Sequence, residues 1–177
     1  MKKLFIISLL SLASCTSNKI LMDYMEQEIK KEGITKIVIY EDKASVKYTI
    51  NTLRGPTSNG KRSGPTSMIL RDTDFLFLYE KYKNDTVNEA WKKSDFKNFD
   101  IKVINSEISL DNKVDLITKG YRYFYFLSKP LFLDENLGFF YFSKASGWTV
   151  LFSGVVVMKK TDGKWEVVEK VQSTELN

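Results

Sequence analysis

The stretch that decides the fold lies near the C-terminus, where residues 149–171 read TVLFSGVVVMKKTDGKWEVVEKV. Valine and other strand-favouring residues dominate both halves of this stretch. Asp162 and Gly163 stand between the halves, and this pair tolerates the positive φ that a tight turn requires. Trp165 is expected in the core. The pattern predicts a β-hairpin of two strands, 149–160 and 164–171.

Further strand-like segments precede this hairpin, with aromatic and β-branched residues gathered between polar turns. The strands predicted upstream are 36–40, 45–53, 101–105, 121–128, 130–133 and 137–143. The first two are expected to pair as a hairpin, because apolar and polar side chains alternate over 46–50.

Helical spacing marks the N-terminal and central parts of the chain. Apolar residues recur every fourth position over 20–32, and Gly33 can end that helix in the left-handed conformation. A second helix is favoured after Asp72 or its neighbour, although the run 75–79 could also form a buried strand. One or two helical turns are expected over 87–94. We therefore predict an α+β domain, with N-terminal and mid-chain helices packed on a mainly antiparallel sheet that ends in a meander.

The composition bounds the possible classes of function. The chain has 177 residues, of which 43% are hydrophobic, so it supports one packed core and not two ordinary domains. Its 9 Gly and 3 Pro are too few for a disordered or collagen-like chain. The sequence contains no His. That absence excludes Ser-His-Asp, Cys-His and HExxH chemistry.

The N-terminus has the pattern of a secretory leader. Lys2 and Lys3 precede an apolar run over 4–12, which is shorter than the ~20 residues that a membrane-spanning helix needs. The following Leu12-Ala13-Ser14-Cys15 resembles the lipobox of bacterial lipoprotein signal peptides. The resemblance implies cleavage before Cys15, diacylglycerol on its sulfur and usually a third acyl chain on the new amino terminus.

This leader divides the chain into a signal peptide at 1–14, a lipidated Cys15 with a short tether at 15–19, and a single α+β domain at 20–177. Two or more acyl chains anchor a protein stably. The expected location is therefore the cell envelope, on the outer or inner membrane and facing the periplasm or the surface. A plain secretory leader with a chance Cys, or a buried N-terminal core helix, is the alternative. Acylation would leave no free thiol for a disulfide.

The charge balance of the mature protein is mild. The full chain carries a formal charge of +5, and loss of Lys2 and Lys3 leaves about +3. This value does not indicate nucleic acid as a partner, whereas anionic lipid or polysaccharide is compatible with it. The expected partners are the membrane, through the lipid anchor, and an envelope protein or polysaccharide. No cofactor is expected.

The C-terminal half resembles that of small, mostly uncharacterised exported proteins of Gram-negative bacteria. The segments that carry the resemblance are Ser128-Lys129-Pro130-Leu131-Phe132, 139–142 and 155–165. These are strand and turn residues, so the resemblance implies an exported protein and brings no activity with it.

A loop over 54–67 contains a partial phosphate-binding motif. Gly55-Pro56-Thr57-Ser58-Asn59-Gly60-Lys61 matches G-x-x-x-x-G-K. Arg62, however, stands where a Ser or Thr hydroxyl should hold the metal, and no helix is expected to follow. We interpret the segment as an exposed basic loop, with anion or partner binding through Lys61 and Arg62 as the alternative.

Catalytic motifs are weak when they are tested against chance. Ser94 and Lys97 fit S-x-x-K, but the composition predicts about two such pairs by chance. Paired carboxylates could serve a glycoside hydrolase. The candidates Asp72, Asp74, Asp95, Asp100, Asp134 and Glu135 show no recognisable pairing. The segment 111–115 lacks the glycine and closing Glu of a calcium loop, so no metal is expected.

Aromatic strands supply the remaining candidate binding surface. Alternation places Tyr121, Tyr123 and Tyr125 on one face of their strand and Phe124 on the other. The Tyr row could form an outer platform that stacks on sugars or on a partner, with Trp148 in a nearby bend as a further contact. The alternative is that both faces are covered, one by helices and one by the long loop.

The sequence therefore predicts a membrane-anchored envelope lipoprotein whose domain binds a ligand or supports an assembly without catalysis. The alternative is an envelope hydrolase that uses paired carboxylates or a Ser/Lys pair.

Overall fold

The computed structural model describes residues 5–58, 61–62, 66–85, 90–96 and 99–173, with the backbone alone at 5–17, 57–58 and 61–62. The helices are α1 (Phe5–Glu32), α2 (Val46–Arg54), α3 (Asp72–Tyr82), the 3-10 helix η1 (Lys93–Phe96) and α4 (Leu110–Thr118). The strands are β1 (Lys36–Ala44), β2 (Thr57–Ser58), β3 (Lys61–Arg62), β4 (Asp100–Ile104), β5 (Tyr123–Ser128), β6 (Leu131–Phe132), β7 (Leu137–Ser146), β8 (Thr149–Thr161) and β9 (Lys164–Gln172). The predicted α+β class is confirmed.

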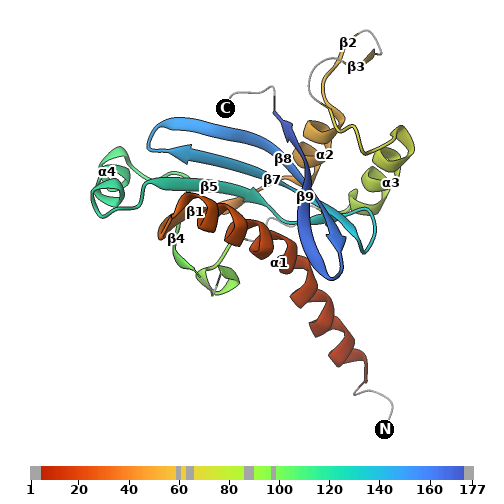
Figure 1. Ribbon diagram of the computed structural model, residues 1–177, viewed down its shortest axis with the longest axis horizontal. Coiled ribbons are helices and arrows are strands. Elements are labelled where there is room, and N and C mark those ends of the chain that lie inside the picture. The colour runs from red at the N-terminus through yellow and green to blue at the C-terminus, as the bar shows by residue number, and fades with distance from the viewer. Residues whose placement is uncertain (1–4, 59–60, 63–65, 86–89, 97–98, 174–177) are drawn as a thin grey trace.

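Seven strands form one mixed, mostly antiparallel sheet in the order β4-β1-β5-β7-β8-β9, with β6 paired to β7 (Figure 1). The strands from β5 to β9 are antiparallel neighbours, as the C-terminal meander predicts. In contrast, β1 lies between β4 and β5 and runs parallel to both. Parallel strands need long crossover connections. Here α2 and α3 connect β1 to β4, and α4 connects β4 to β5.

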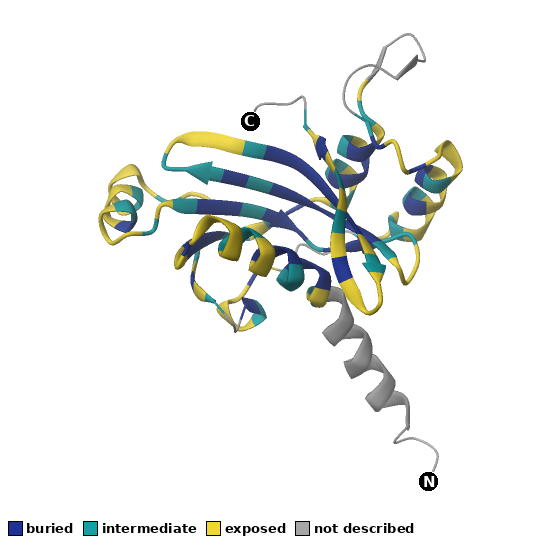
Figure 2. Cartoon of the chain, in the orientation of Figure 1, coloured by how far each residue is buried: buried dark blue, intermediate teal, exposed yellow. Residues whose placement is uncertain are grey.

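Helices cover both faces of the sheet. On one face, α1 packs Ile20, Tyr24 and Met25 against sheet residues such as Tyr125 and Phe142. On the opposite face, α2 and α3 pack over the strands near one end of the sheet, and α4 packs near the other end (Figure 1). Buried residues consequently run along the middle of β5, β7 and β8 (Figure 2). The opposite face is thus covered by two separate groups of helices.

The predicted hairpin at 36–40 and 45–53 is wrong in its second half. Residues 46–54 form α2, which begins after Ser45, whose Oγ accepts a hydrogen bond from the Tyr48 N–H at 3.1 Å. Both edges of β1 are already paired, one with β4 and the other with β5. No edge remains for residues 45–53, so this segment folds as a capped helix that buries Ile50 and Leu53.

Several other expectations are confirmed. Gly33 has a φ of 63° just after α1, and Asp162 and Gly163 have φ values of 51° and 79° at the predicted hairpin turn. Trp165 is 5% exposed and lies in the core. The helix after Asp72 forms as α3.

Other segments differ from expectation. The tether predicted at 15–19 is part of the continuous helix α1. Residues 87–89 of the helical segment predicted at 87–94 lie outside the described residues, residues 90–92 are not helical, and the 3-10 helix η1 begins at Lys93. Helix α4 was not predicted, because its sequence is polar and Leu116 is the only buried residue that the helix contributes.

Candidate functional site

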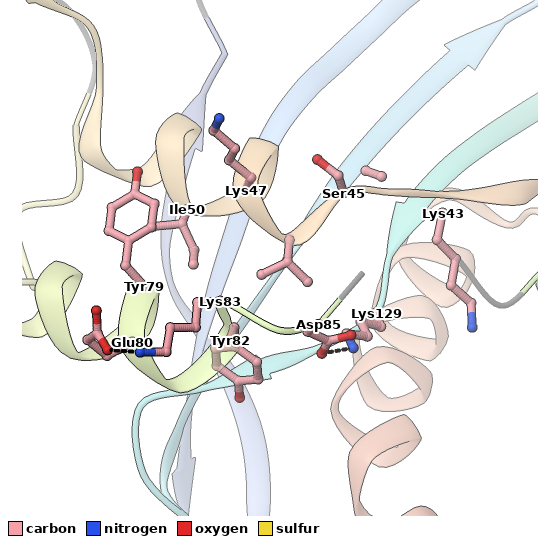
Figure 3. A pocket seen from close by; sticks show the side chains of 12 residues that line it. Lys43, Ser45, Lys47, Ile50, Tyr79, Glu80, Tyr82, Lys83, Asp85 and Lys129 are labelled. Carbon is pink, nitrogen blue, oxygen red and sulfur yellow. Dashed lines mark hydrogen bonds and ion pairs between the residues drawn. The ribbon is translucent and has the colours of Figure 1, made fainter. Parts of the chain in front are cut away.

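A cavity of about 580 Å³ opens where β1 ends and α2 begins, and α3 forms its other side (Figure 3). We call this cavity the basic pocket. It is lined by Lys43, Ala44, Ser45, Val46, Lys47, Ile50, Tyr79, Glu80, Tyr82, Lys83, Asp85 and Lys129. Its volume lies in the range of small-molecule sites. Three segments that are far apart in sequence therefore meet here.

The position of the basic pocket follows from the topology. In sheets with parallel strands, ligands bind beyond the carboxyl ends of the strands, where helices begin. β1 ends at Ala44, and Ser45 caps α2 immediately afterwards. The first N–H groups of a helix have no intrahelical acceptor. The Ser45 side chain accepts a hydrogen bond from the N–H of Tyr48, and Val46 and Lys47, the first residues of α2, line the pocket.

Lysines outnumber carboxylates in the basic pocket by four to two. Lys83 pairs with Glu80 at 2.5 Å, and Lys129 pairs with Asp85 (Figure 3). The ammonium group of Lys43 lies 4.2 Å from the centroid of the Trp91 ring. Lys47 is exposed. Each of these ion pairs is neutral overall, so the charge of Lys47 gives this side of the pocket a positive potential that favours an anion.

The other walls of the basic pocket are apolar and aromatic. Tyr82 Oη accepts a hydrogen bond from the Phe132 N–H at 2.8 Å, and burial raises the pKa of Tyr82, so this phenol is neutral at pH 7. The Tyr79 hydroxyl donates to the Asn51 side chain. Ile50 is buried at the base of the wall that α2 provides. A bound molecule would therefore meet cations on one side and hydrocarbon or aromatic surface on the other.

The predicted Tyr platform is not an outward-facing row. Tyr125 is fully buried beneath α1, and Tyr121 and Tyr123 are half-buried. The Nζ of Lys144 lies 4.7 Å from the Tyr123 ring centroid, and Lys144 pairs with Glu32 of α1. The expectation of an exposed row is wrong because α1 covers this face. The opposite face, which holds Phe124, is covered by α4.

The remaining predicted site residues lie apart from the basic pocket. Trp148 is 61% exposed at the β7–β8 turn, with the Nζ of Lys113 4.0 Å from its ring centroid. Lys61 and Arg62 form β3, and their side chains lie outside the described residues. Cys15 lies within α1, and its side chain is likewise outside what the structure describes.

Three of the six carboxylates considered for catalysis accept hydrogen bonds from nearby backbone N–H groups. Asp74 accepts a hydrogen bond from the Arg71 N–H at 2.8 Å, at the start of α3. Asp134 accepts from the Asn136 and Leu137 N–H groups in the turn before β7. Asp95 accepts from the Lys92 N–H at 2.9 Å. Lys97 of the S-x-x-K pattern lies outside the described residues.

Sequence reasoning missed the residues of the basic pocket because each one looks ordinary in isolation. The sequence pattern predicts that Ser45 begins a strand. An N-cap serine with lysines on either side, Lys43 and Lys47, was the one local signal that could have indicated an anion site. Nothing in the sequence joins these residues to Lys83 or Lys129, which approach them only in the fold.

Comparison with known proteins gives no match, whether with protein-family models, with curated proteins or with solved structures. Over the ranges that the structure describes, no helix is both long and apolar enough to cross a membrane. Those same residues contain no cluster of three or more Asp, Glu, Cys or His side chains suited to a metal ion.

Proposed function

We propose that this chain is a lipid-anchored protein of the cell envelope whose domain binds a small amphiphilic anion in the basic pocket, without catalysis. The observation that carries the proposal is the excess of lysines beside the N-terminus of α2 in a cavity of ligand size. Such lysines and helix N–H groups donate hydrogen bonds to an anion, and a carboxylate or phosphate group can accept them. The aromatic and aliphatic walls favour an apolar portion on the same molecule.

The arrangement supports binding over catalysis. Glu80 and Asp85, the two carboxylates of the basic pocket, each pair with a lysine. In a carboxylate hydrolase two carboxyl groups flank the scissile bond, whereas here each carboxylate is taken up by a lysine. Both groups are therefore better suited to holding lysines in place than to transferring protons.

The membrane anchor rests on the lipobox resemblance at Cys15. From Ile20 onward, α1 packs against the sheet, so the folded domain begins five positions after the cysteine. A lipid at Cys15 would hold the domain close to the membrane surface. Ligands with an acyl chain and an anionic head would then be abundant near the basic pocket.

Binding is tested by titrating the protein with octyl phosphate below its micelle concentration, with the neutral, sugar-free tetraethylene glycol octyl ether as the matched probe. Lys47→Gln should weaken octyl phosphate binding about fivefold, because one partner of the anion loses its charge. The control Lys93→Gln changes an exposed lysine outside the pocket and should bind as the wild type does. Equal affinity of the two variants, or equal affinity for the two probes, would contradict the proposal.

The anchor is tested by replacing Cys15 with Ala and separating membrane from soluble fractions. We expect the variant to lose labelling by a radioactive fatty acid and to leave the membrane fraction, since the acyl chains have no other attachment point. Ser17→Ala, two positions further on, should behave as the wild type. Unchanged labelling of Cys15→Ala would exclude lipidation at this residue.

A further inference from the structure

A second concavity lies on the sheet face opposite α1, in the interval between the two groups of helices that cover this face. Its volume is about 300 Å³. We call it the sheet cleft. The residues that carry the argument are Tyr40, Phe126, Tyr141, Ser143 and Ser153, all from the sheet, with Ser106 from the segment after β4 at the rim.

The strand register explains why these side chains come together. Phe126 of β5 is paired with Ser143 of β7, and Ser143 is paired in turn with Ser153 of β8. Paired residues of neighbouring strands point to the same face. A row of short hydroxyl side chains therefore crosses the sheet beside larger aromatic residues. The helices leave Phe126 and Ser143 half-buried, with Ser153 buried at the floor, because α2 and α3 pack on residues such as Phe139 and Val157, and α4 packs on Val38 and Phe124.

The sheet cleft presents neutral hydroxyl groups. No Lys, Arg, Asp or Glu is among its lining residues in the described part of the chain. At its floor the Tyr141 and Ser153 hydroxyls are hydrogen-bonded at 2.6 Å. Burial raises the pKa of Tyr141 to about 12 and also raises that of Tyr40. Both phenols therefore keep their protons at pH 7.

Aromatic rings and the exposed side chain of Val150 form the remaining surface of the sheet cleft. The Phe126 and Tyr141 rings are 6.1 Å apart between centroids at an interplanar angle of 74°, so they present two differently oriented surfaces. A sugar ring has an apolar face of C–H groups that stacks on aromatic rings, and a rim of hydroxyl groups that both donate and accept hydrogen bonds. Serine and tyrosine hydroxyls can do the same.

We propose that the sheet cleft binds a neutral carbohydrate of one or two sugar units. Aromatic walls, serine hydroxyls and the lack of charge in the lining fit this class of ligand better than an anion, a cation or a wholly apolar molecule. The site is independent of the basic pocket, which differs from it in charge and lining. α2 contacts both sites, since Tyr48 packs edge-on against Tyr141 at 5.0 Å while Lys47 lines the basic pocket.

The test is a nuclear magnetic resonance titration of the protein, labelled with ¹⁵N, using cellobiose and N-acetylglucosamine as probes. We expect saturable shifts at the Ser143 and Ser153 amides. Tyr40→Phe removes one hydroxyl and keeps the ring, and should weaken binding about fivefold. Ser143→Leu fills the cleft and should abolish binding, whereas Ser94→Leu, at an exposed site outside the cleft, should bind as the wild type does.

Octyl phosphate distinguishes loss of the site from loss of the fold. Ser143→Leu should still bind this anion in the basic pocket, and a variant that fails to do so is replaced by Tyr40→Phe as the deciding measurement. The proposal is overturned if neither sugar shifts the cleft amides, or if Tyr40→Phe binds the sugars as tightly as the wild type. It is also overturned if the charged sugar glucuronate binds as tightly as the neutral probes.

Discussion

At the scale of single residues, two lysines of the sheet form ion pairs with carboxylates of α1. Lys144 is 4% exposed and pairs with Glu32, and Lys170 bonds to Glu28 at 3.0 Å and to the Tyr24 hydroxyl. These contacts fix α1 against β7 and β9. The hydroxyl of Tyr125 lies among them, buried and without a hydrogen-bond partner among the residues that the structure describes.

Tyr125→Phe should therefore raise the stability of the protein. A buried hydroxyl without a partner costs free energy that the unfolded chain, solvated by water, does not incur. We expect the free energy of unfolding to rise by about 1 kcal/mol, as measured by urea denaturation. The control Tyr82→Phe removes a hydroxyl that does have a partner, the backbone of Phe132, and should destabilise the protein. A loss of stability in Tyr125→Phe would show that this hydroxyl is satisfied in solution.

At the scale of elements, the sequence predicts correctly those helices and strands whose formation depends on interactions between residues close in the chain. The β8–β9 hairpin needs only its turn at Asp162 and Gly163 and two strand-forming halves. α2 could not be predicted in this way. The alternation over 46–50 favours a strand. The outcome depends on the parallel pairing of β1 with β4 and β5, whose paired residues lie 64 to 86 positions further on. α4 was not predicted because few apolar residues recur at helical spacing in its sequence, and only Leu116 is buried.

The same distinction applies to the candidate site. Trp148 and the tyrosines of β5 stood out because aromatic residues are conspicuous in a sequence. The polar side of the basic pocket comes chiefly from lysines and Ser45, residue types that are common on any surface. They form a pocket only because α3 and Lys129 approach the end of β1. Because these residues come from segments that are far apart in the chain, they form no motif with a recognisable spacing.

The start of α3 gives a prediction about pH. The hydrogen bond from the Arg71 N–H holds the pKa of Asp74 below its ordinary value of 3.8. A carboxyl group whose pKa is lowered by folding stabilises the protein above that ordinary value, and the contribution is lost as the pH falls through the folded-state pKa. Asp74→Ala should lower the free energy of unfolding by about 1 kcal/mol at pH 7, a typical cost for a lost cap.

Urea denaturation of wild type and Asp74→Ala between pH 7 and pH 2.5 measures this effect. The difference between the two proteins should narrow below pH 4. Asp100→Ala, at an exposed position in β4, is the control and should show no such cap effect. A difference that stays constant over the whole range would mean that the charge of Asp74 plays no part in starting the helix.

At the scale of the whole molecule, the two faces of the sheet differ in what covers them. One face receives α1, the helix that continues from the proposed anchor, and this face is closed by apolar packing and ion pairs. The opposite face holds α2, α3 and α4 in two groups (Figures 1 and 2). It carries the sheet cleft, and the basic pocket lies at the α2 and α3 end. The proposed binding surfaces thus lie away from the helix that would lead to the membrane.

The most direct measurement is a map of backbone amide shifts when octyl phosphate is added to the ¹⁵N-labelled protein. The account predicts the largest changes at Val46 and Lys47, with smaller ones over 79–85, and a loss of affinity at high salt because the contact is ionic. Shifts that gather at Ser143 and Ser153 instead, or saturable binding that does not respond to salt, would contradict the assignment of the basic pocket to an anion.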